Sequence, residues 1–325
     1  QVLATSGNLN NDLGVPLTLA RLDHHHDFAV IEMGANHGGE IAGLCRLAAP
    51  TVALITQCAP AHLEGFGSIE GVARAKGEIY QGLDPEGFAV LNADDPWYGL
   101  WRDLAAERAR IRFGLEAPAD VTATWQGHAQ GSTLRVTTPV GVTGVELPLP
   151  GRHNVMNALA VAAVAVALGL PLEQLAAGLA AVDPVDGRLR LLPGRRGARL
   201  VDDAYNANPG SVRAAIDYLA ALEGERWLVL GDMAELGKEA RELHAQVGRH
   251  AREAGIDHLF TCGDLSAAAT QAFGPGAVHY RDRDALIPDL EDAIHGEAVV
   301  LVKGSRAAGM EAVVAALAGE GASCS

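Results

Sequence analysis

Ala73-Arg74-Ala75-Lys76-Gly77-Glu78-Ile79 is the stretch of this chain that says most about its fold and its chemistry. Two earlier segments belong with it, Ile31-Glu32-Met33-Gly34-Ala35 and Ala59-Pro60-Ala61-His62-Leu63-Glu64-Gly65-Phe66-Gly67. Each of the three follows a predicted strand or lies on the helix just after one. Ligands of parallel sheets gather at the carboxyl ends of the strands, so these segments place a carboxylate, an imidazole and an amine at one edge of a sheet.

The three side chains are those of Glu32, His62 and Lys76. Glu32 and His62 can hold a divalent cation directly, although imidazole is a poorer ligand for Mg²⁺. Lys76 cannot do so in its usual form, because an ammonium repels a cation. Two interpretations remain open: an ordinary helix-surface lysine with Glu70 or Glu78 nearby, or a lysine that is converted into an anion. The residue types alone favour the surface lysine.

Strand and helix patterns alternate along the first half of the chain. Short apolar strands at 28–32, 52–56 and 88–91 are separated by predicted helices at 38–47 and 68–81. Such alternation predicts an α/β fold with a mostly parallel, doubly wound sheet and helices on both of its faces.

Residues 121–147 contain three short strand patterns separated by Gly-containing turns, which predicts an antiparallel appendage. A long helix is expected from 153 to about 168. The cluster Asp183-Pro184-Val185-Asp186-Gly187 predicts the domain boundary, with a central domain at 1–183 and a C-terminal domain at 184–325. Strand–helix alternation resumes beyond it, so the second domain is predicted to be smaller and Rossmann-like. Its expected strands are 199–203, 227–230, 258–262 and 299–302.

Composition narrows the class of protein. The formal net charge of the 325 residues is -15, which argues against a nucleic-acid partner because phosphate backbones require basic patches. No run of eighteen apolar residues is free of charge, Gly or Pro, so no membrane span is expected. Four scattered cysteines fit the reduced thiols of a cytoplasmic protein better than a disulfide framework. His24-His25-His26 lies at a predicted loop and could bind a stray metal ion, although a solvated turn is the favoured interpretation.

The three segments resemble the central domain of the Mur ligases, the ATP-dependent amide-forming enzymes of peptidoglycan synthesis. In that family the lysine that matches Lys76 carries a carbamate derived from CO₂, whose oxygens help to hold Mg²⁺. The likeness extends from about residue 2 to residue 317. Six motifs carry it in the same order along the chain: Ser6-Gly7-Asn8-Leu9-Asn10-Asn11 with Gly14-Val15-Pro16-Leu17-Thr18, Glu32-Met33-Gly34-Ala35, Ala75-Lys76-Gly77-Glu78, Asp202-Asp203-Ala204-Tyr205-Asn206-Ala207-Asn208, Gly231-Asp232-Met233-Ala234-Glu235-Leu236-Gly237 and Val302-Lys303-Gly304-Ser305-Arg306.

The resemblance also implies a nucleotide site. By residue chemistry, Asn suits an adenine edge, Arg suits phosphate, and Asp suits ribose hydroxyls. Asn92 could equally be a turn or capping residue, and both interpretations stay open. Asp202 and Asp203 are adjacent on a predicted strand, so only one of them is expected to face the site. The residues that the resemblance assigns to ATP are Asn92, His153, Asn154, Asn157, Arg188 and Asp203.

Two polar loops of the second domain, 202–208 and 303–306, follow predicted strands. Cationic side chains there could hold the carboxylates of a peptide, and a helix start adds N–H donors. A helix cap with surface charges remains an alternative, above all for Arg306. Near the amino end, asparagines could cap a helix or touch the muramyl part of a donor. The predicted substrate residues are Asn8, Asn11, Tyr205, Asn206, Asn208, Lys303, Ser305 and Arg306.

The resemblance implies a monomeric ligase that uses ATP and Mg²⁺ to join D-alanyl-D-alanine to UDP-N-acetylmuramoyl-tripeptide through an acyl phosphate. Its metal-binding and catalytic residues would be Glu32, His62 and a carbamylated Lys76. Residues of both domains would close around ATP. The alternatives are a folylpolyglutamate synthase-like ligase, another Mur ligase, and a non-catalytic nucleotide-binding module.

The start of the chain carries one more expectation. The sequence opens on Gln1 and contains no G-x-x-x-x-G-K-[ST] phosphate loop. In the Mur ligases that loop lies just upstream of the point that matches Gln1. The chain is therefore expected to be a fragment of a longer protein and a poor catalyst by itself.

Overall fold

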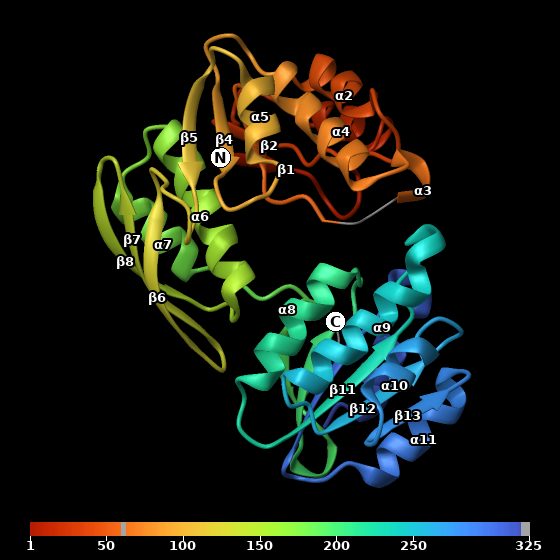
Figure 1. Ribbon diagram of the computed structural model, residues 1–325. Coiled ribbons are helices and arrows are strands. Elements are labelled where there is room, and N and C mark those ends of the chain that lie inside the picture. The colour runs from red at the N-terminus through yellow and green to blue at the C-terminus, as the bar shows by residue number, and fades with distance from the viewer. Residues whose placement is uncertain (60–62, 320–325) are drawn as a thin grey trace. The chain divides into compact units, whose positions relative to one another are not determined.

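The computed structural model describes residues 1–59 and 63–319, the side chains of residues 63 and 64 excepted. Contacts within the chain divide it into two compact units (Figure 1). Unit 1 comprises Gln1–Thr124, Arg135–Val145 and Met156–Ala177. Unit 2 comprises Trp125–Leu134, Glu146–Val155 and the chain from Gly178 onward.

Five strands of unit 1, β1 to β5, pair in parallel and form two sheets. β1 (Val2–Ala4) pairs with β2 (Phe28–Val30), while β3 (Val52–Ile55), β4 (Phe88–Asn92) and β5 (Ala109–Phe113) follow one another in the second sheet. The parallel pairing confirms the predicted α/β fold. The division into two sheets and the strands β1 and β5 were not predicted.

Five helices accompany these strands: α1 (Gly14–Leu19), α2 (Glu40–Ala48), α3 (Leu63–Phe66), α4 (Ile69–Gln81) and α5 (Tyr98–Ala105). The serine before α4 accepts a hydrogen bond from the backbone N–H three residues on, so it caps the helix as its sequence position suggests. α4 and α5 share an apolar cluster with β3 and β4, whereas α1 and α2 contribute to a second one.

Two buried aromatic side chains with polar atoms fix α4 against its neighbours. The hydroxyl of Tyr80 donates to the backbone oxygen of Val90 (2.7 Å) and accepts from the backbone N–H of Ile55 (3.1 Å). The indole N–H of Trp101, on α5, donates to the backbone oxygen of Ala73 (2.9 Å). Buried polar groups need such partners, so these bonds set the position of α4 relative to β3 and β4.

β6 (Thr122–His128), β7 (Gly131–Thr138) and β8 (Gly141–Leu147) form a separate three-stranded sheet in that order. Two-residue connections join these neighbours, so they run antiparallel, as predicted. α6 (Arg152–Ala167) lies close to the helix predicted from 153 to about 168, and α7 (Leu172–Ala180) follows it. Within residues 1–59 and 63–319, no helix has the length and apolar character needed to cross a membrane.

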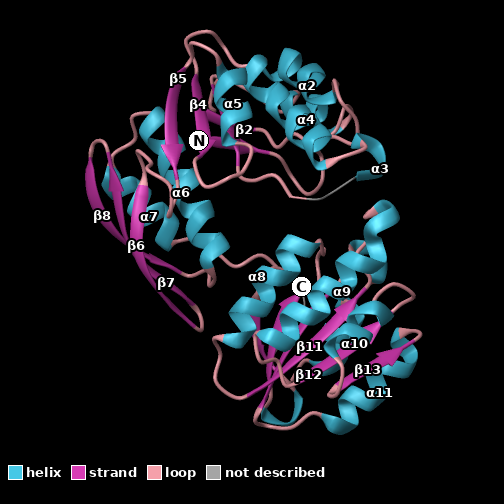
Figure 2. Cartoon of the chain, viewed as in Figure 1, coloured by secondary structure: helices cyan, strands magenta, loops and turns pink. Residues whose placement is uncertain are grey.

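Unit 2 contains a six-stranded sheet in the order β13-β12-β11-β14-β10-β9 (Figure 2). All neighbours are parallel except β9, which runs antiparallel to β10. The four predicted strands are present as β10, β11, β12 and β14, while the two edge strands β9 and β13 were not predicted. The bounds are β9 (Arg190–Pro193), β10 (Arg199–Asp203), β11 (Glu225–Gly231), β12 (His258–Cys262), β13 (Ala277–Tyr280) and β14 (Ala298–Lys303).

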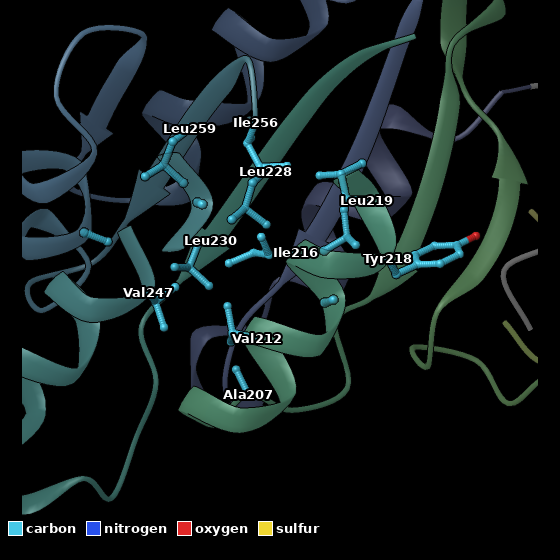
Figure 3. Close-up of a cluster of buried hydrophobic side chains, with 14 of the residues drawn as sticks. Ala207, Val212, Ile216, Tyr218, Leu219, Leu228, Leu230, Val247, Ile256 and Leu259 are labelled. Atoms are coloured by element: carbon cyan, nitrogen blue, oxygen red, sulfur yellow. The ribbon is translucent and has the colours of Figure 1, made fainter. Parts of the chain in front are cut away.

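Helices cover both faces of this sheet, because strand side chains alternate between them. Leu228 and Leu230 of β11 pack with α8, α9 and α10, whereas Trp227 and Val229 pack with α11 and α12. Figure 3 shows the first of these clusters, where side chains of α8 meet those of β11 and β12. The helices are α8 (Pro209–Ala220), α9 (Ala240–Glu253), α10 (Ala267–Phe273), α11 (Arg283–Ala293) and α12 (Glu311–Leu317), with 3₁₀ turns η1 (Arg195–Gly197), η2 (Gly237–Glu239) and η3 (Arg306–Ala308).

Candidate active site

Helix α4 holds Lys76 close to the carboxyl end of β3. Its Nζ atom lies 3.4 Å from the backbone oxygen of Gln57, and its charge also acts on the buried carboxylate of Asp95. Burial raises the pKa of Asp95, and hydrogen bonds from the backbone N–H groups of Cys58 (2.7 Å) and Trp97 (2.8 Å) offset part of that rise. Asp95 was not among the predicted site residues, although it comes soon after a strand end.

The residues that follow Lys76 in the motif fix the helix that carries it. Gly77 lets α5 approach α4, since a Cβ atom there would lie 2.4 Å from a methyl carbon of Leu104. Glu78 accepts hydrogen bonds from the backbone N–H groups of Gly39 (2.7 Å) and Ala42 (3.0 Å), at the start of α2. Free N–H groups at a helix start stabilise a carboxylate. The motif therefore packs one helix and ties a second to it, which sequence reasoning missed.

Glu32 lies two residues beyond β2 and is exposed. Its Oε1 accepts a hydrogen bond from the Nδ2 of Asn10 (2.8 Å), and its backbone N–H donates to the hydroxyl of Thr5 (2.9 Å). Gly34 leaves room for this contact, since a Cβ atom there would lie 3.0 Å from the carboxamide of Asn10. Asn10 thus orients the predicted metal ligand, a role that sequence reasoning did not assign to it.

The two other asparagines of that segment were predicted to contact substrate. The Oδ1 of Asn11 accepts hydrogen bonds from the backbone N–H groups of Leu13 (3.2 Å) and Gly14 (2.9 Å), at the start of α1. Asn8 is exposed. The geometry of Asn11 is that of a helix-capping residue, which is one of the two interpretations that the sequence left open.

Asn92 is buried at the end of β4, and both ends of its carboxamide are used. Nδ2 donates to the backbone oxygen of Thr56 (2.7 Å), and Oδ1 accepts from the backbone N–H of Asp94 (3.0 Å). These bonds connect β4 to the end of β3, so they support the turn interpretation over contact with adenine. His62, the remaining predicted metal ligand, lies outside the described residues.

In unit 2, Lys303 and Asp203 form a buried ion pair where β14 and β10 end. The Nζ atom lies 2.6 Å from the carboxylate and 3.0 Å from the backbone oxygen of Asn206, while the two charged side chains are only 4% and 11% exposed. The carboxylate also accepts a hydrogen bond from the backbone N–H of Leu189 (3.2 Å). Burial raises the pKa of Asp203, and the ammonium offsets part of that rise. The structure brings these two predicted site residues together as partners of one another.

Tyr205 projects from the same loop with 41% of its surface exposed. The Cζ atoms of Arg188 and Arg306 lie 4.7 Å and 5.7 Å from the centre of its ring, within the range of cation–π contacts. Both arginines are themselves exposed. Two guanidinium groups beside one ring can receive phosphate or carboxylate oxygens. Three predicted site residues from three separate segments therefore meet here.

Several other predicted residues hold backbone in these loops. Asn208 caps α8, because its Oδ1 accepts from the backbone N–H of Ser211 (2.9 Å) and the Ser211 hydroxyl accepts from the backbone N–H of Asn208 (3.0 Å). The Oδ1 of Asn206 accepts from the N–H of the next residue (2.8 Å). Ser305 is buried, and its N–H donates to the backbone oxygen of Asp232 (2.9 Å).

Asp232 connects the loops after β11, β12 and β14. Besides the bond to Ser305, its carboxylate accepts from the backbone N–H groups of Leu265 (3.1 Å) and Ser266 (2.7 Å). Gly263 has a φ of +116°, and a Cβ atom there would lie 2.5 Å from the carboxylate. The Gly-Asp pair, a weak signal in the sequence, thus fixes the loop that contains Arg306.

The start of α6 carries the remaining nucleotide candidates. Burial and the charge of Lys303 lower the pKa of His153 to about 4, so this imidazole is neutral at pH 7. The Nδ2 of Asn154 donates to the backbone oxygen of Pro150 (2.8 Å), and Asn157 is exposed.

Comparison with models of protein families finds two domains in this chain. A model of the Mur ligase middle domain matches residues 1–165, and a model of the Mur ligase glutamate ligase domain matches residues 187–306. The chain therefore belongs to the Mur ligase family.

Individual relatives show which members of the family this chain is similar to. The UDP-N-acetylmuramoyl-tripeptide–D-alanyl-D-alanine ligase of Escherichia coli (strain K12) is 49% identical over 319 residues, which cover 97% of this chain and 70% of that protein. A crystal structure of MurF from Acinetobacter baumannii matches with a TM-score of 0.92 at 37% identity and covers 97% of this chain and 70% of its own. MurF from Thermotoga maritima in complex with ADP matches with a TM-score of 0.87 at 28% identity, over 97% and 72%.

These likenesses confirm the predicted family and the α/β fold with parallel sheets. The predicted domain bounds and the roles of individual residues stay predictions.

Proposed function

We propose that this chain belongs to an enzyme that carries out the ATP- and Mg²⁺-dependent ligation of D-alanyl-D-alanine to UDP-N-acetylmuramoyl-tripeptide. The observation that supports it most is the 49% identity, over 97% of the chain, with the E. coli ligase named for this reaction. The ADP bound to the T. maritima relative supports a nucleotide as the second substrate.

The reaction has to activate a carboxylate, which is a poor electrophile. Transfer of the γ-phosphoryl group of ATP to the donor carboxylate gives an acyl phosphate and ADP. The neutral amine of the dipeptide then attacks the acyl carbon, and the products are the amide, phosphate and a proton. No covalent enzyme nucleophile is required, so the protein contributes position and charge.

Exposed cations of unit 2 are suited to the anionic groups of both substrates. We assign Arg188 to ATP phosphate and Arg306 to the carboxylate of the dipeptide, with Tyr205 as the ring against which both guanidinium groups rest. We assign Lys303 to holding the loop of Tyr205, because its ammonium is already bound to Asp203 and is buried. A buried paired charge is expensive to release to a ligand.

On the metal side, Glu32 offers an exposed carboxylate that Asn10 orients, which fits the preference of Mg²⁺ for hard oxygen ligands. The family resemblance adds His62. Bound there, Mg²⁺ would neutralise the repulsion between the donor carboxylate and the phosphates.

We propose as a separate step that the neutral amine of Lys76 attacks CO₂ and loses a proton, which gives a carbamate. The support is the motif around Lys76. Its described surroundings, the backbone oxygen of Gln57 and the carboxylate of Asp95, also suit a plain ammonium. With ¹³CO₂ and Mg²⁺, a ¹³C carbamate resonance should appear in the full-length protein and vanish in Lys76→Arg. If no such resonance forms, Lys76 acts as an ammonium and the ligase proposal still stands.

A phosphate-release assay on the full-length protein tests the function itself. With ATP, Mg²⁺ and the UDP-linked tripeptide, D-alanyl-D-alanine should stimulate release, while D-alanine and glutamate should not. Stimulation by glutamate with a folate acceptor would favour the folylpolyglutamate synthase alternative. No release under any of these conditions would favour a nucleotide-binding module.

A further inference from the structure

The connection between α1 and β2 gathers three side chains that can bind a metal ion. One possible ligand atom from each of Asp23, His24 and His25 lies within 4.8 Å of those of the other two. Among the residues that the structure describes, this is the one cluster of three or more His, Cys, Asp or Glu side chains that meets this spacing. It is also a motif that the ligase reaction leaves without a role.

A tight turn produces the cluster. The carboxylate of Asp23 accepts a hydrogen bond from the backbone N–H of His25 (2.8 Å), which brings the His25 ring to 3.2 Å from the same oxygen. The rings of His24 and His25 lie 3.9 Å apart, centre to centre. His26 supports the turn from the other side, because its Nδ1 accepts from the backbone N–H of Asp23 (3.2 Å).

The three side chains are open to solvent. Those of Asp23 and His25 are 52% and 60% exposed, and His24 is exposed as well, whereas that of His26 is only 17% exposed. A metal ion can therefore reach all three ligand atoms. His26 uses its Nδ1 for the backbone, so we count it as a support of the turn and not as a ligand.

The chemistry of this ligand set differs from that of the magnesium site. Mg²⁺ prefers oxygen ligands, whereas one carboxylate with two imidazoles suits the later divalent metals, Zn²⁺, Ni²⁺ and Cu²⁺. Ligand atoms about 2.0–2.1 Å from a tetrahedral zinc ion lie roughly 3.4 Å from one another. Small rotations of exposed side chains bring atoms from within 4.8 Å to that spacing.

We propose that Asp23, His24 and His25 bind one Zn²⁺ ion, with water completing its coordination. The ion would hold the turn at residues 23–25, which lies between α1 and β2. If Zn²⁺ binds the folded turn more tightly than the unfolded chain, the stability of unit 1 should rise with the logarithm of the free zinc concentration. The proposal is independent of the ligase function, and its test requires no catalysis.

Calorimetric titration with ZnCl₂ tests it, on protein without an affinity tag and in a buffer that does not chelate. The wild type should bind one Zn²⁺, and the double variant H24N/H25N should bind it at least about tenfold more weakly, since two of three ligands are gone. His37→Asn is the matched control, because His37 is also exposed but meets a single acid, Glu40, at 3.2 Å. Equal affinity in the wild type and the double variant, or equal loss in the control, would overturn the proposal.

A spectrum identifies the ligands directly and does not depend on the affinity of a variant. Electron paramagnetic resonance of one equivalent of Cu²⁺ should show superhyperfine coupling to two imidazole nitrogens, and H24N/H25N should abolish it. A tenfold excess of Mg²⁺ should leave the signal unchanged. A copper spectrum without nitrogen coupling, or one that Mg²⁺ removes, would place the ion elsewhere and refute the site.

Discussion

Units 1 and 2 use the same residue types in opposite ways. In unit 1, Glu32 is exposed and Lys76 reaches a backbone oxygen only at 3.4 Å. In unit 2, Lys303 and Asp203 are nearly inaccessible and bind each other at 2.6 Å. An exposed charge can turn to a ligand at little expense, whereas a buried charge must keep its partner. This contrast is the basis of our proposal that Lys303 and Asp203 hold the site in place, while Glu32 and Lys76 act in it.

The substitution Lys303→Met is the strongest test of this contrast between the units. It leaves the carboxylate of Asp203 buried without its cation, so the free energy of unfolding should fall by about 3–5 kcal/mol. Urea denaturation followed by circular dichroism measures this. The double variant D203N/K303M should recover much of the loss, because it removes the orphaned charge. A single variant as stable as the wild type would show that the pair is not part of the scaffold.

A smaller effect is expected from pH, through His153. The pKa of this imidazole falls from 6.5 in the unfolded chain to about 4 in the folded protein. The unfolded state therefore binds a proton first as the pH falls, so stability is complete above pH 6.5 and is lost between pH 6.5 and 4. The free energy of unfolding should fall by about 2–3 kcal/mol over this range. The variant His153→Gln should not show this fall. Parallel pH profiles of the two proteins would contradict this assignment.

Glu78→Gln tests the link between α4 and α2. Weakening two hydrogen bonds from a helix start to a carboxylate should lower the free energy of unfolding by about 1–2 kcal/mol. Glu70→Gln is the matched control on the same helix, since Glu70 pairs with Arg74 in solvent and should contribute about 0.3–0.5 kcal/mol. If thermal unfolding of the two variants gives equal losses, Glu78 is an ordinary surface residue.

The sequence predicted the parts of this molecule that depend on periodicity and on motif order. The strands β10 and β14 and the loop of Tyr205 were all expected, although β14 was predicted one residue short at each end. The pairing of distant residues was not predicted. The residues around Lys303 do not indicate that Asp203, a hundred positions earlier, will neutralise its charge. Similarly, Asn10 and Asn11 look alike in sequence, and only the fold brings Asn10 to Glu32 and leaves Asn11 at the start of α1.

The edge strands β9 and β13 escaped prediction for a different reason. They are short, and their residues are half exposed, so they lack the continuous apolar run that marks a buried parallel strand such as β14.

Lys76→Met should have the smallest effect on stability and a large effect on function. Within the described part of the chain, the hydrogen bond of Nζ is a long one to the backbone oxygen of Gln57, so the free energy of unfolding should change by about 0.5 kcal/mol or less. Phosphate release by the full-length protein should fall at least about 100-fold, because our proposal places the charge of Lys76 at the reacting groups. Arg74→Met is the control, because Arg74 lies two positions earlier on the same helix and pairs with Glu70 in solvent; it should leave both quantities nearly unchanged. If Lys76→Met destabilises the protein as much as Lys303→Met does, the two lysines have the same role, and the distinction between the units collapses.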